Sequence, residues 1–236
     1  MKKSIIVTGG NGTFAKTLKL KNKKLNLKFL SKKELNILST KSIENSLLKY
    51  KPRILIHTAG LSRPMEQHDI KISESIDLNI IGTANIVKSC KKFNVKVIYF
   101  STVYVYDGQK GNFRETDPIK PINNYALSKM GGECSVLMYK NSLVLRIQMT
   151  EKPFLYDKAF SDLYTNFMFH EELAPILPKI INEFGVMNIG GKKRSVYGFA
   201  KIHNKNVKKI RNNIKLPPNQ TMNLDKLKKI IKKWIY

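Results

Sequence analysis

The most constraining feature of this sequence is a short apolar run that leads directly into a glycine-rich turn. Residues 4–7 read Ser-Ile-Ile-Val, a β-branched pattern typical of a buried strand. Gly9, Gly12 and Ala15 then follow at the spacing of a dinucleotide-binding turn. In such a turn the first glycine allows the bend, the second lets backbone approach a pyrophosphate, and the small third residue lets the helix pack on the strand. We therefore predict a dinucleotide site whose contacts here are Gly9, Gly12, Thr13 and Phe14.

Strand-like and helix-like segments alternate through the first 148 residues. Further strands are expected near 28–31, 53–57, 95–100 and 143–147, with helices over 14–20, 40–50, 73–93 and 125–139. This alternation predicts an α/β fold, a Rossmann-like doubly wound parallel sheet with helices on both faces. We expect residues 1–148 to form an NAD(P)-binding Rossmann domain and residues 149–236 a small C-terminal substrate-binding lobe. In that lobe, 160–182 reads as mostly helical, 185–191 as a strand, and 195–203 and 223–234 as helices.

Tyr125 and Lys129 are the residues of this chain best placed for acid–base chemistry. If Tyr125 opens a helix, Lys129 lies one turn on and on the same face. A nearby ammonium favours phenolate and should lower the tyrosine pKa. Such a tyrosine can give a proton to a carbonyl oxygen, and a hydroxyl such as Thr102 could hold the same oxygen. The same spacing recurs at 106/110 and 197/201, but only Tyr125 follows a strand that ends in Ser-Thr.

The ends of two other predicted strands carry the remaining cofactor candidates. Thr58, Ala59 and Gly60 follow the third strand and are small enough for backbone to pass close to a cofactor. The second strand ends in Ser31 and Lys32 rather than in the acid that usually takes the ribose hydroxyls of NAD. This ending favours the 2′-phosphate of NADP, and NAD remains the alternative.

Composition narrows the partners of the chain. The formal net charge is +26, but the lysines are dispersed and arginine, the better reader of bases, is scarce. We expect no specific nucleic-acid binding, although the charge would attract anionic substrates. Cys90 and Cys134 are isolated, so no metal site is predicted. No apolar run approaches the ~20 residues that span a bilayer, and the N-terminal apolar run is too short for a signal peptide, so we expect a cytoplasmic protein that does not bind membranes.

Several of these stretches together resemble the extended short-chain dehydrogenase/reductase family. They are Thr8-Gly9-x-x-Gly12-x-x-Ala15, His57-Thr58-Ala59-Gly60, Asn79-x-x-Gly82-Thr83, Ser101-Thr102 and Tyr125-x-x-x-Lys129. Within the family, the residues between Tyr104 and Tyr125, with 188–191 and 195–200, look most like the dTDP-4-dehydrorhamnose reductases. The resemblance implies NAD(P)H-dependent reduction of a 4-keto group on a nucleotide-linked deoxysugar. The chain is short for this family, which implies a trimmed substrate lobe.

The resemblance also implies roles for single residues. Tyr125 would donate the proton, Lys129 would bind the nicotinamide ribose, and Thr102 would bind the keto oxygen. Asn79 would be structural, part of a proton path or a cofactor contact. Val103 stands where these reductases usually have Asp, and no Asp-Glu pair supports dehydration. The alternatives are an NAD-dependent nucleotide-sugar 4-epimerase and a non-catalytic dinucleotide- or RNA-binding protein of the same fold, with a homodimer left open.

Overall fold

Six parallel strands form the central sheet of the computed structural model, which describes residues 4–23, 25–213 and 216–232. Their order is β10-β5-β4-β3-β1-β2. The bounds are β1 Ile5–Thr8, β2 Leu27–Leu30, β3 Ile54–His57, β4 Lys96–Thr102, β5 Ser142–Ile147 and β10 Gly185–Ile189. All neighbouring strands pair in parallel. The predicted Rossmann-like fold is confirmed.

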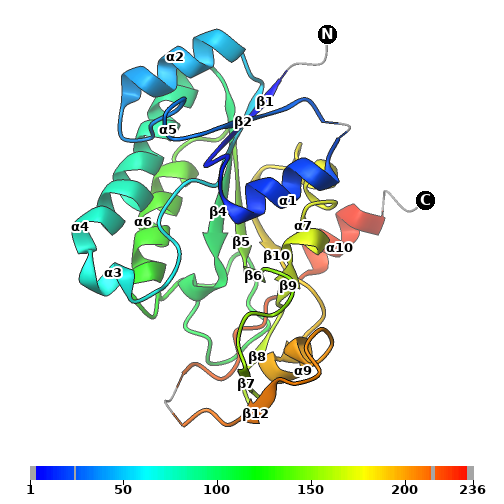
Figure 1. Cartoon of the computed structure of the whole chain (residues 1–236). Coiled ribbons are helices and arrows are strands. Elements are labelled where there is room, and N and C mark those ends of the chain that lie inside the picture. Colours follow the sequence, from blue (N-terminus) through cyan, green and yellow to red (C-terminus); the bar gives the residue numbers. More distant parts are fainter. Residues whose placement is uncertain (1–3, 24, 214–215, 233–236) are drawn as a thin grey trace.

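Helices cover both faces of this sheet, as Figure 1 shows. On one face lie α2 Thr40–Tyr50, α5 Gly82–Lys92 and α6 Asn124–Leu137. On the other lie α1 Thr13–Lys21, α7 His170–Leu173, α8 Leu177–Ile180 and α10 Asp225–Lys232. The expected helix over 223–234 is thus α10, and its predicted last two residues lie outside the described ones.

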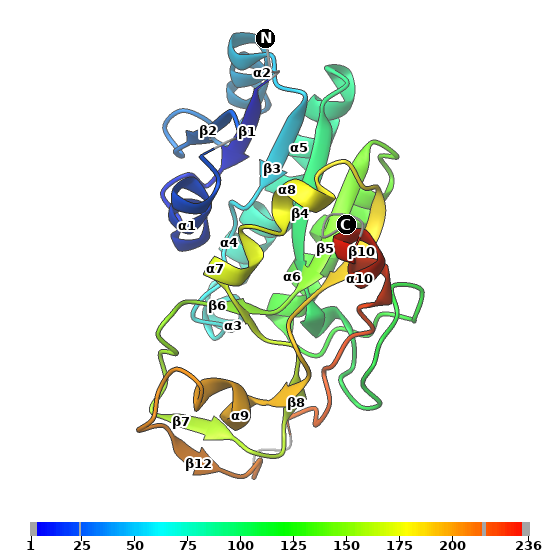
Figure 2. The same cartoon turned by 90° about the vertical axis from the view of Figure 1, so that its right-hand side faces the viewer.

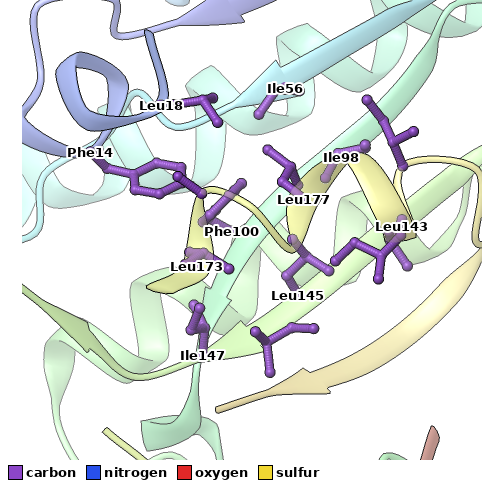
Figure 3. Packing of buried hydrophobic residues seen from close by; sticks show 14 of the residues in the cluster. Phe14, Leu18, Ile56, Ile98, Phe100, Leu143, Leu145, Ile147, Leu173 and Leu177 are labelled. Atoms are coloured by element: carbon purple, nitrogen blue, oxygen red, sulfur yellow. The ribbon is translucent and has the colours of Figure 1, made fainter. Parts of the chain in front are cut away.

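Alternation of side chains along each strand builds the two cores. Ile5 and Val7 point to the α1 side, where they join Phe14, Leu173 and Leu177 (Figure 3). Ile6, between them, belongs to the separate cluster under α2 and α5. Strands buried on both faces read as continuous apolar runs, which is why the sequence revealed them.

The long helix expected over 73–93 is present, but it is not uniform. It consists of α4 Ile72–Ser75, a π-helical turn η1 over Ile76–Ile81, and α5. A short helix, α3 Gln67–Ile70, precedes it. The wide turn contains Asn79, the polar residue that interrupts the apolar face. Such π-helical turns frequently occur at functional sites.

The prediction of a mostly helical segment over 160–182 is wrong in its first half. The chain forms short strands there, β8 Tyr164–Thr165 and β9 Met168–Phe169, and only then α7 and α8. Strand β9 pairs with β6 Met149–Thr150, and β8 pairs with β11 Arg194–Ser195. Two-residue strands are too short for a periodic pattern, so the sequence did not reveal them.

Residues 152–167, 191–213 and 216–222 form a unit below the main sheet, which we call the lobe (Figure 2). It contains β7 Lys158–Phe160, β8, β11, α9 Val196–Ala200 and β12 Lys208–Ile210. Phe154, Ala159, Phe199 and Val207 are in its small core. In contrast, α7, α8, β10 and α10 pack back on the main sheet. The domain boundary at residue 148 stays a prediction. No helix among the described residues could cross a membrane.

Candidate active site

A cavity of about 770 Å³ lies between the carboxyl ends of the sheet strands and the lobe. The strand order reverses between β1 and β3, and this is where open α/β sheets bind their ligands. Gly9, Thr58 and Thr102 line the sheet side of the cavity, at the ends of β1, β3 and β4. Lys158 and Tyr164 line it from the lobe. The cavity therefore joins the predicted cofactor turn to the predicted catalytic residues.

The glycine turn after β1 has the geometry of an anion-binding cradle. Gly9 has a φ of 67°, and a Cβ there would come within 3.0 Å of the Ala59 backbone. Gly12 is the N-cap of α1, with no side-chain cap and no acid in the first helical turn. The amides at that end are left for a ligand. Gly12, Thr13 and Phe14 line the cavity, so these residues fit a dinucleotide diphosphate.

A further glycine of this turn, Gly10, was not predicted to have a role. A Cβ at Gly10 would lie 2.8 Å from the carbonyl carbon of Phe29, so Gly10 lets the turn pack on β2. No motif signalled this contact, because it depends on the neighbouring strand.

Polar contacts fix the loop after β3. The hydroxyl of Thr8 accepts hydrogen bonds from the amides of Thr58 and Ala59, each at 3.2 Å. Below the loop, Asn79 accepts from the Leu61 amide at 2.8 Å and donates to Ser128 Oγ at 2.8 Å. Asn79 is buried and does not line the cavity, so its side chain braces the loop and α6. Its direct contact with a cofactor stays a prediction.

Tyr125 and Thr102 both line the cavity. Tyr125 is at the start of α6, whose N-cap Asn123 accepts from the Ala126 amide at 2.8 Å. The side chain of Thr102, which is buried at the end of β4, lies close enough to the Tyr125 hydroxyl to lower its pKa. Burial has the larger effect and raises the pKa of Tyr125 to about 12, although Thr102 and Arg63 lower it. The expected lowering of this pKa is not found.

Burial is the largest cause of the raised Tyr125 pKa, and it also acts on Lys129. Its Nζ lies 4.2 Å from the centroid of the Tyr99 ring and lines the cavity one helical turn after Tyr125. Burial lowers the pKa of Lys129 to about 7, against the attraction of Glu133. A lysine that is half neutral at pH 7 stabilises phenolate less than sequence spacing suggests.

A buried ion pair holds the catalytic helix to the sheet. Glu133 on α6 accepts from Ser101 Oγ at 2.5 Å, and Arg146 on β5 donates to it at 2.6 and 3.0 Å. Arg146 also donates to the hydroxyl of Tyr106 at 2.8 Å. Tyr106 in turn donates to Asn188 on β10 at 2.9 Å. This chain of bonds fixes both Ser101 and α6, and with them the residues beside the cavity.

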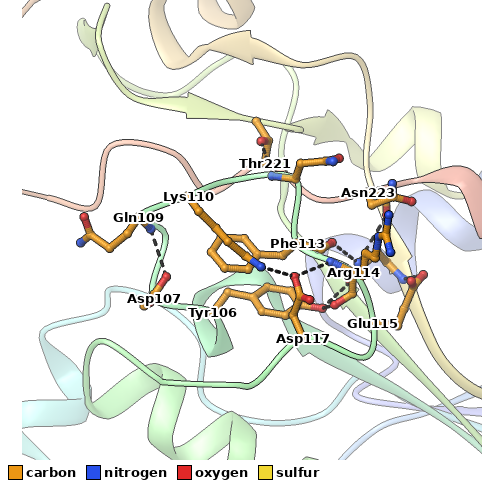
Figure 4. A network of polar contacts seen from close by, with 12 residues as sticks. Tyr106, Asp107, Gln109, Lys110, Phe113, Arg114, Glu115, Asp117, Thr221 and Asn223 are labelled. Carbon is orange, nitrogen blue, oxygen red and sulfur yellow. Dashed lines mark hydrogen bonds and ion pairs between the residues drawn. The ribbon is translucent and has the colours of Figure 1, made fainter.

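Polar and ring contacts connect the residues of the loop between Tyr106 and Asp117 to one another and to Thr221, as Figure 4 shows. Tyr106 stacks on Phe113 with ring centroids 4.7 Å apart. Lys110 pairs with Asp117 at 2.9 Å, and the Phe113 amide donates to the Thr221 carbonyl at 3.0 Å. The Tyr106/Lys110 spacing is therefore structural, and both residues are already engaged.

Ser31 and Lys32 lie outside the cavity, at the end of β2. Both the amide and the hydroxyl of Ser31 donate to Glu34 Oε2 at 2.8 Å, and these bonds lower the Glu34 pKa. An acid therefore does stand near the strand end, three residues after Ser31. Glu34 was not predicted to lie beside Ser31, because the contact depends on the chain turning back after β2. The preference for NADP stays a prediction.

Several polar residues that line the cavity were not predicted from the sequence. Arg63 pairs with Glu151 and donates to the Met149 carbonyl at 2.9 Å. Gln148 donates to the Tyr104 hydroxyl at 3.1 Å. His170 lines the cavity from α7. Gln148 follows a strand end and could have been found by that rule, but the others carry no sequence signal.

Comparison with known proteins identifies related chains. The family model described as the RmlD substrate binding domain matches residues 1–169. The dTDP-4-dehydrorhamnose reductase of Aggregatibacter actinomycetemcomitans is 27% identical over 151 residues, which cover 62% of this chain and 51% of that enzyme. The methionine adenosyltransferase 2 subunit beta of Bos taurus is 32% identical over 119 residues, 48% of this chain and 34% of that protein. The chain thus spans about half the length, or less, of these curated relatives.

Solved structures extend the likeness to nearly the whole chain. The dTDP-4-dehydrorhamnose reductase of Bacillus anthracis str. Ames in complex with NADP has a TM-score of 0.85 at 21% identity. The match covers 97% of this chain and 91% of that one, including the lobe. At this identity the likeness shows the fold.

Proposed function

We propose a function from one premise: this chain belongs to the family described as the RmlD substrate binding domain. The proposal is that it reduces the 4-keto group of a nucleotide-linked deoxysugar with NADPH. The observation that carries it is the proximity of Thr102 to the Tyr125 hydroxyl in a cavity that the dinucleotide turn also lines. The activity of the related reductase is proposed, not assigned, for this chain, because the match spans about half of that enzyme.

Two hydroxyls of the chain would handle the proton. The chemistry that NADPH supplies is a hydride for the carbonyl carbon. Tyr125 donates its proton to the carbonyl oxygen as negative charge develops there, and Thr102 holds the same oxygen. The raised pKa keeps Tyr125 protonated at neutral pH, as a general acid requires. Lys129, one turn on, would bind the ribose of the cofactor.

The lobe would bind the nucleotide part of the substrate. Tyr156, Phe160 and Tyr164 present aromatic rings to the cavity, and Lys158 presents a cation. Aromatic faces suit a base, and an ammonium suits a phosphate. This division supports a nucleotide-linked sugar rather than a free one.

The decisive test mixes the purified chain with NADPH and a dTDP-4-keto-6-deoxysugar and follows absorbance of the reduced nicotinamide. Net oxidation of NADPH that requires the sugar nucleotide supports the reductase. Isomerisation of a 4-hydroxy sugar nucleotide with NAD, and no net NADPH oxidation, would support the epimerase instead. Tyr197→Phe serves as the control variant, because Tyr197 is on α9 and outside the cavity lining.

A non-catalytic role is the second candidate. The match to a methionine adenosyltransferase subunit favours it, since that relative is named as a subunit of another enzyme. Dinucleotide binding without turnover of any 4-keto sugar nucleotide would support this candidate.

Four further expectations belong to this proposal. The cofactor is NADP, with NAD as the alternative, and the chain is cytoplasmic and binds no specific nucleic acid. A homodimer is supported by the exposed apolar side chains of Ile70, Ile72, Ile76 and Leu127 on α3, α4, η1 and α6. Light scattering after size exclusion tests it, and a monomer at working concentration would contradict it.

A further inference from the structure

His170 lies where the C-terminal part of the chain meets the dinucleotide turn. It is the first residue of α7 and only 4% exposed, and it lines the cavity. Its ring packs edge-on against Phe14, with centroids 5.5 Å apart and an interplanar angle of 76°. Phe14 is the second residue of α1, and Figure 3 shows it beside the segment that carries Leu173. The ring is thus placed next to the uncapped start of α1.

One nitrogen of this ring has no partner among the described residues. Nδ1 of His170 is buried without a hydrogen-bond partner in the described part of the chain. His57 offers the contrast, because its two nitrogens contact Thr8 Oγ1 at 2.9 Å and Thr83 Oγ1 at 3.1 Å. Buried polar groups are nearly always paired. An unpartnered imidazole in a cavity wall therefore points to a ligand.

Burial and the neighbouring charges determine the protonation state of His170. Burial lowers its pKa, Arg63 acts in the same direction, and Glu151 and Glu171 oppose them. The ring is therefore neutral at pH 7 and carries one N–H donor. A neutral donor in a low-dielectric wall suits an anionic oxygen that the α1 amides also attract.

We propose that His170 donates a hydrogen bond to the diphosphate of the bound dinucleotide, as a contact from the C-terminal part of the chain. The start of α1 supplies backbone amides to the same group, and His170 adds a side-chain donor beside Phe14. This inference rests on the proposed function only in that the chain binds the dinucleotide. It requires no turnover.

The test measures binding rather than activity. His170→Phe keeps an aromatic ring against Phe14 and removes both nitrogens, whereas His170→Gln keeps an N–H. Fluorescence titration should show NADPH binding weakened roughly ten- to a hundredfold by His170→Phe, the range of one hydrogen bond to a charged group. His170→Gln should recover part of this loss. His203→Phe is the matched control, because His203 packs on Phe169 and does not line the cavity.

Competing ligands locate the contact on the cofactor. ADP-ribose contains the diphosphate, whereas adenosine 2′-phosphate lacks it. After correction for the weaker NADPH binding, the inhibition constant of ADP-ribose should rise in His170→Phe, and that of adenosine 2′-phosphate should stay unchanged. An equal rise of both inhibition constants would contradict the diphosphate contact.

Thermal unfolding without ligand separates binding from packing. Removing an unpartnered buried nitrogen should leave the melting temperature of His170→Phe equal to or above that of the wild type. A lower melting temperature with unchanged NADPH affinity in both variants would overturn the inference alone. A wild-type chain that binds neither NADPH nor NADH would overturn the proposed function as well.

Discussion

The sheet side and the lobe side of the cavity are built in opposite ways. On the sheet side, Thr102 and Tyr125 are carried by β4 and α6, which the buried Glu133–Arg146 pair connects to β5. On the lobe side, strands of two or three residues surround a small core that includes Phe154 and Phe199. The sheet side holds the acid–base residues, and the lobe side presents rings and cations.

Charge separates the two sides as well. Residues 184–224 contain nine lysines and arginines and no aspartate or glutamate. The basic residues are dispersed along the whole chain, but in this C-terminal part no acidic residue opposes them. We infer that reaction chemistry requires the rigid side, whereas capture of an anionic substrate requires only a surface of the right sign.

The largest expected effect tests the sheet side. Tyr125→Phe removes one hydroxyl and little volume, so fold and cofactor affinity should survive. Since general-acid catalysis contributes typically about 10²–10⁴-fold, kcat should fall by that order. Steady-state kinetics with saturating NADPH measures this.

The control for this variant follows from the structure. Tyr106→Phe would not serve, because the hydroxyl of Tyr106 bonds Arg146 and Asn188. Tyr197→Phe in the lobe should leave kcat nearly intact. If Tyr197→Phe inactivates the chain and Tyr125→Phe does not, the chemistry has been assigned to the wrong side.

The preference between NADPH and NADH should also be determined by residues of the sheet side. Replacing Lys32 and Lys33 by alanine should reduce the ratio of NADPH to NADH affinity about tenfold, the value of one charge-assisted contact. Glu34→Gln should raise that ratio, because it removes a negative charge bonded to Ser31 at the strand end. Titration with both cofactors measures the ratio. Tighter binding of NADH by the wild type, unchanged in the lysine variant, would refute the NADP preference.

A smaller effect is expected from the charge of the lobe. Changing Lys192, Lys193 and Lys208 to glutamine should lower kcat/KM several-fold at low salt and leave kcat unchanged. The difference should vanish near 0.5 M salt, where the screening length is only about 3–4 Å. The control changes Lys41, Lys88 and Lys91, which are exposed on the far face of the sheet. Equal losses in both variants would mean that net charge, not its position, matters.

The smallest effect concerns stability. The pKa of Lys129 is about 7 in the folded chain against an ordinary 10.5, so between these pH values the unfolded chain binds the extra proton. Stability should therefore rise with pH across this window. Lys129→Met should lack that rise and melt a few degrees higher than wild type near pH 6, at about 2–4 °C per kcal/mol. Thermal melts from pH 6 to 9 measure it, with exposed Lys140→Met as control. Parallel profiles for wild type and Lys129→Met would contradict the prediction.

Sequence patterns revealed the centre of the sheet because β1, β3, β4 and β5 are buried on both faces. The glycine turn, the helix Thr40–Tyr50 and the meeting of Thr102 with Tyr125 were all predictable, since each depends on local spacing or on the end of a strand. The strand over 185–191 was also expected, although its place beside β5 was not.

The residues that sequence could not reveal depend on distant contacts. Arg63 meets Glu151, and His170 meets Phe14, across separations that no periodicity encodes. The pKa of Tyr125 was predicted in the wrong direction because burial, which spacing does not report, raises it. The strands of the lobe, two or three residues long, are too short to give a periodic pattern.

Strand β10 lies about 40 residues after β5 in the sequence, and this has a consequence for folding during synthesis. Strand β5 pairs with β4 on one side, but its other edge is covered only by β10, after the first part of the lobe. Leu173 and Leu177, which cover Phe14 and the sheet, also come from this later part. A nascent chain that has emerged only as far as Gln148 therefore carries an open edge and a bare apolar face. Such surfaces are prone to aggregate, so we expect the emerging chain to depend on chaperones until Ile189 has left the ribosome.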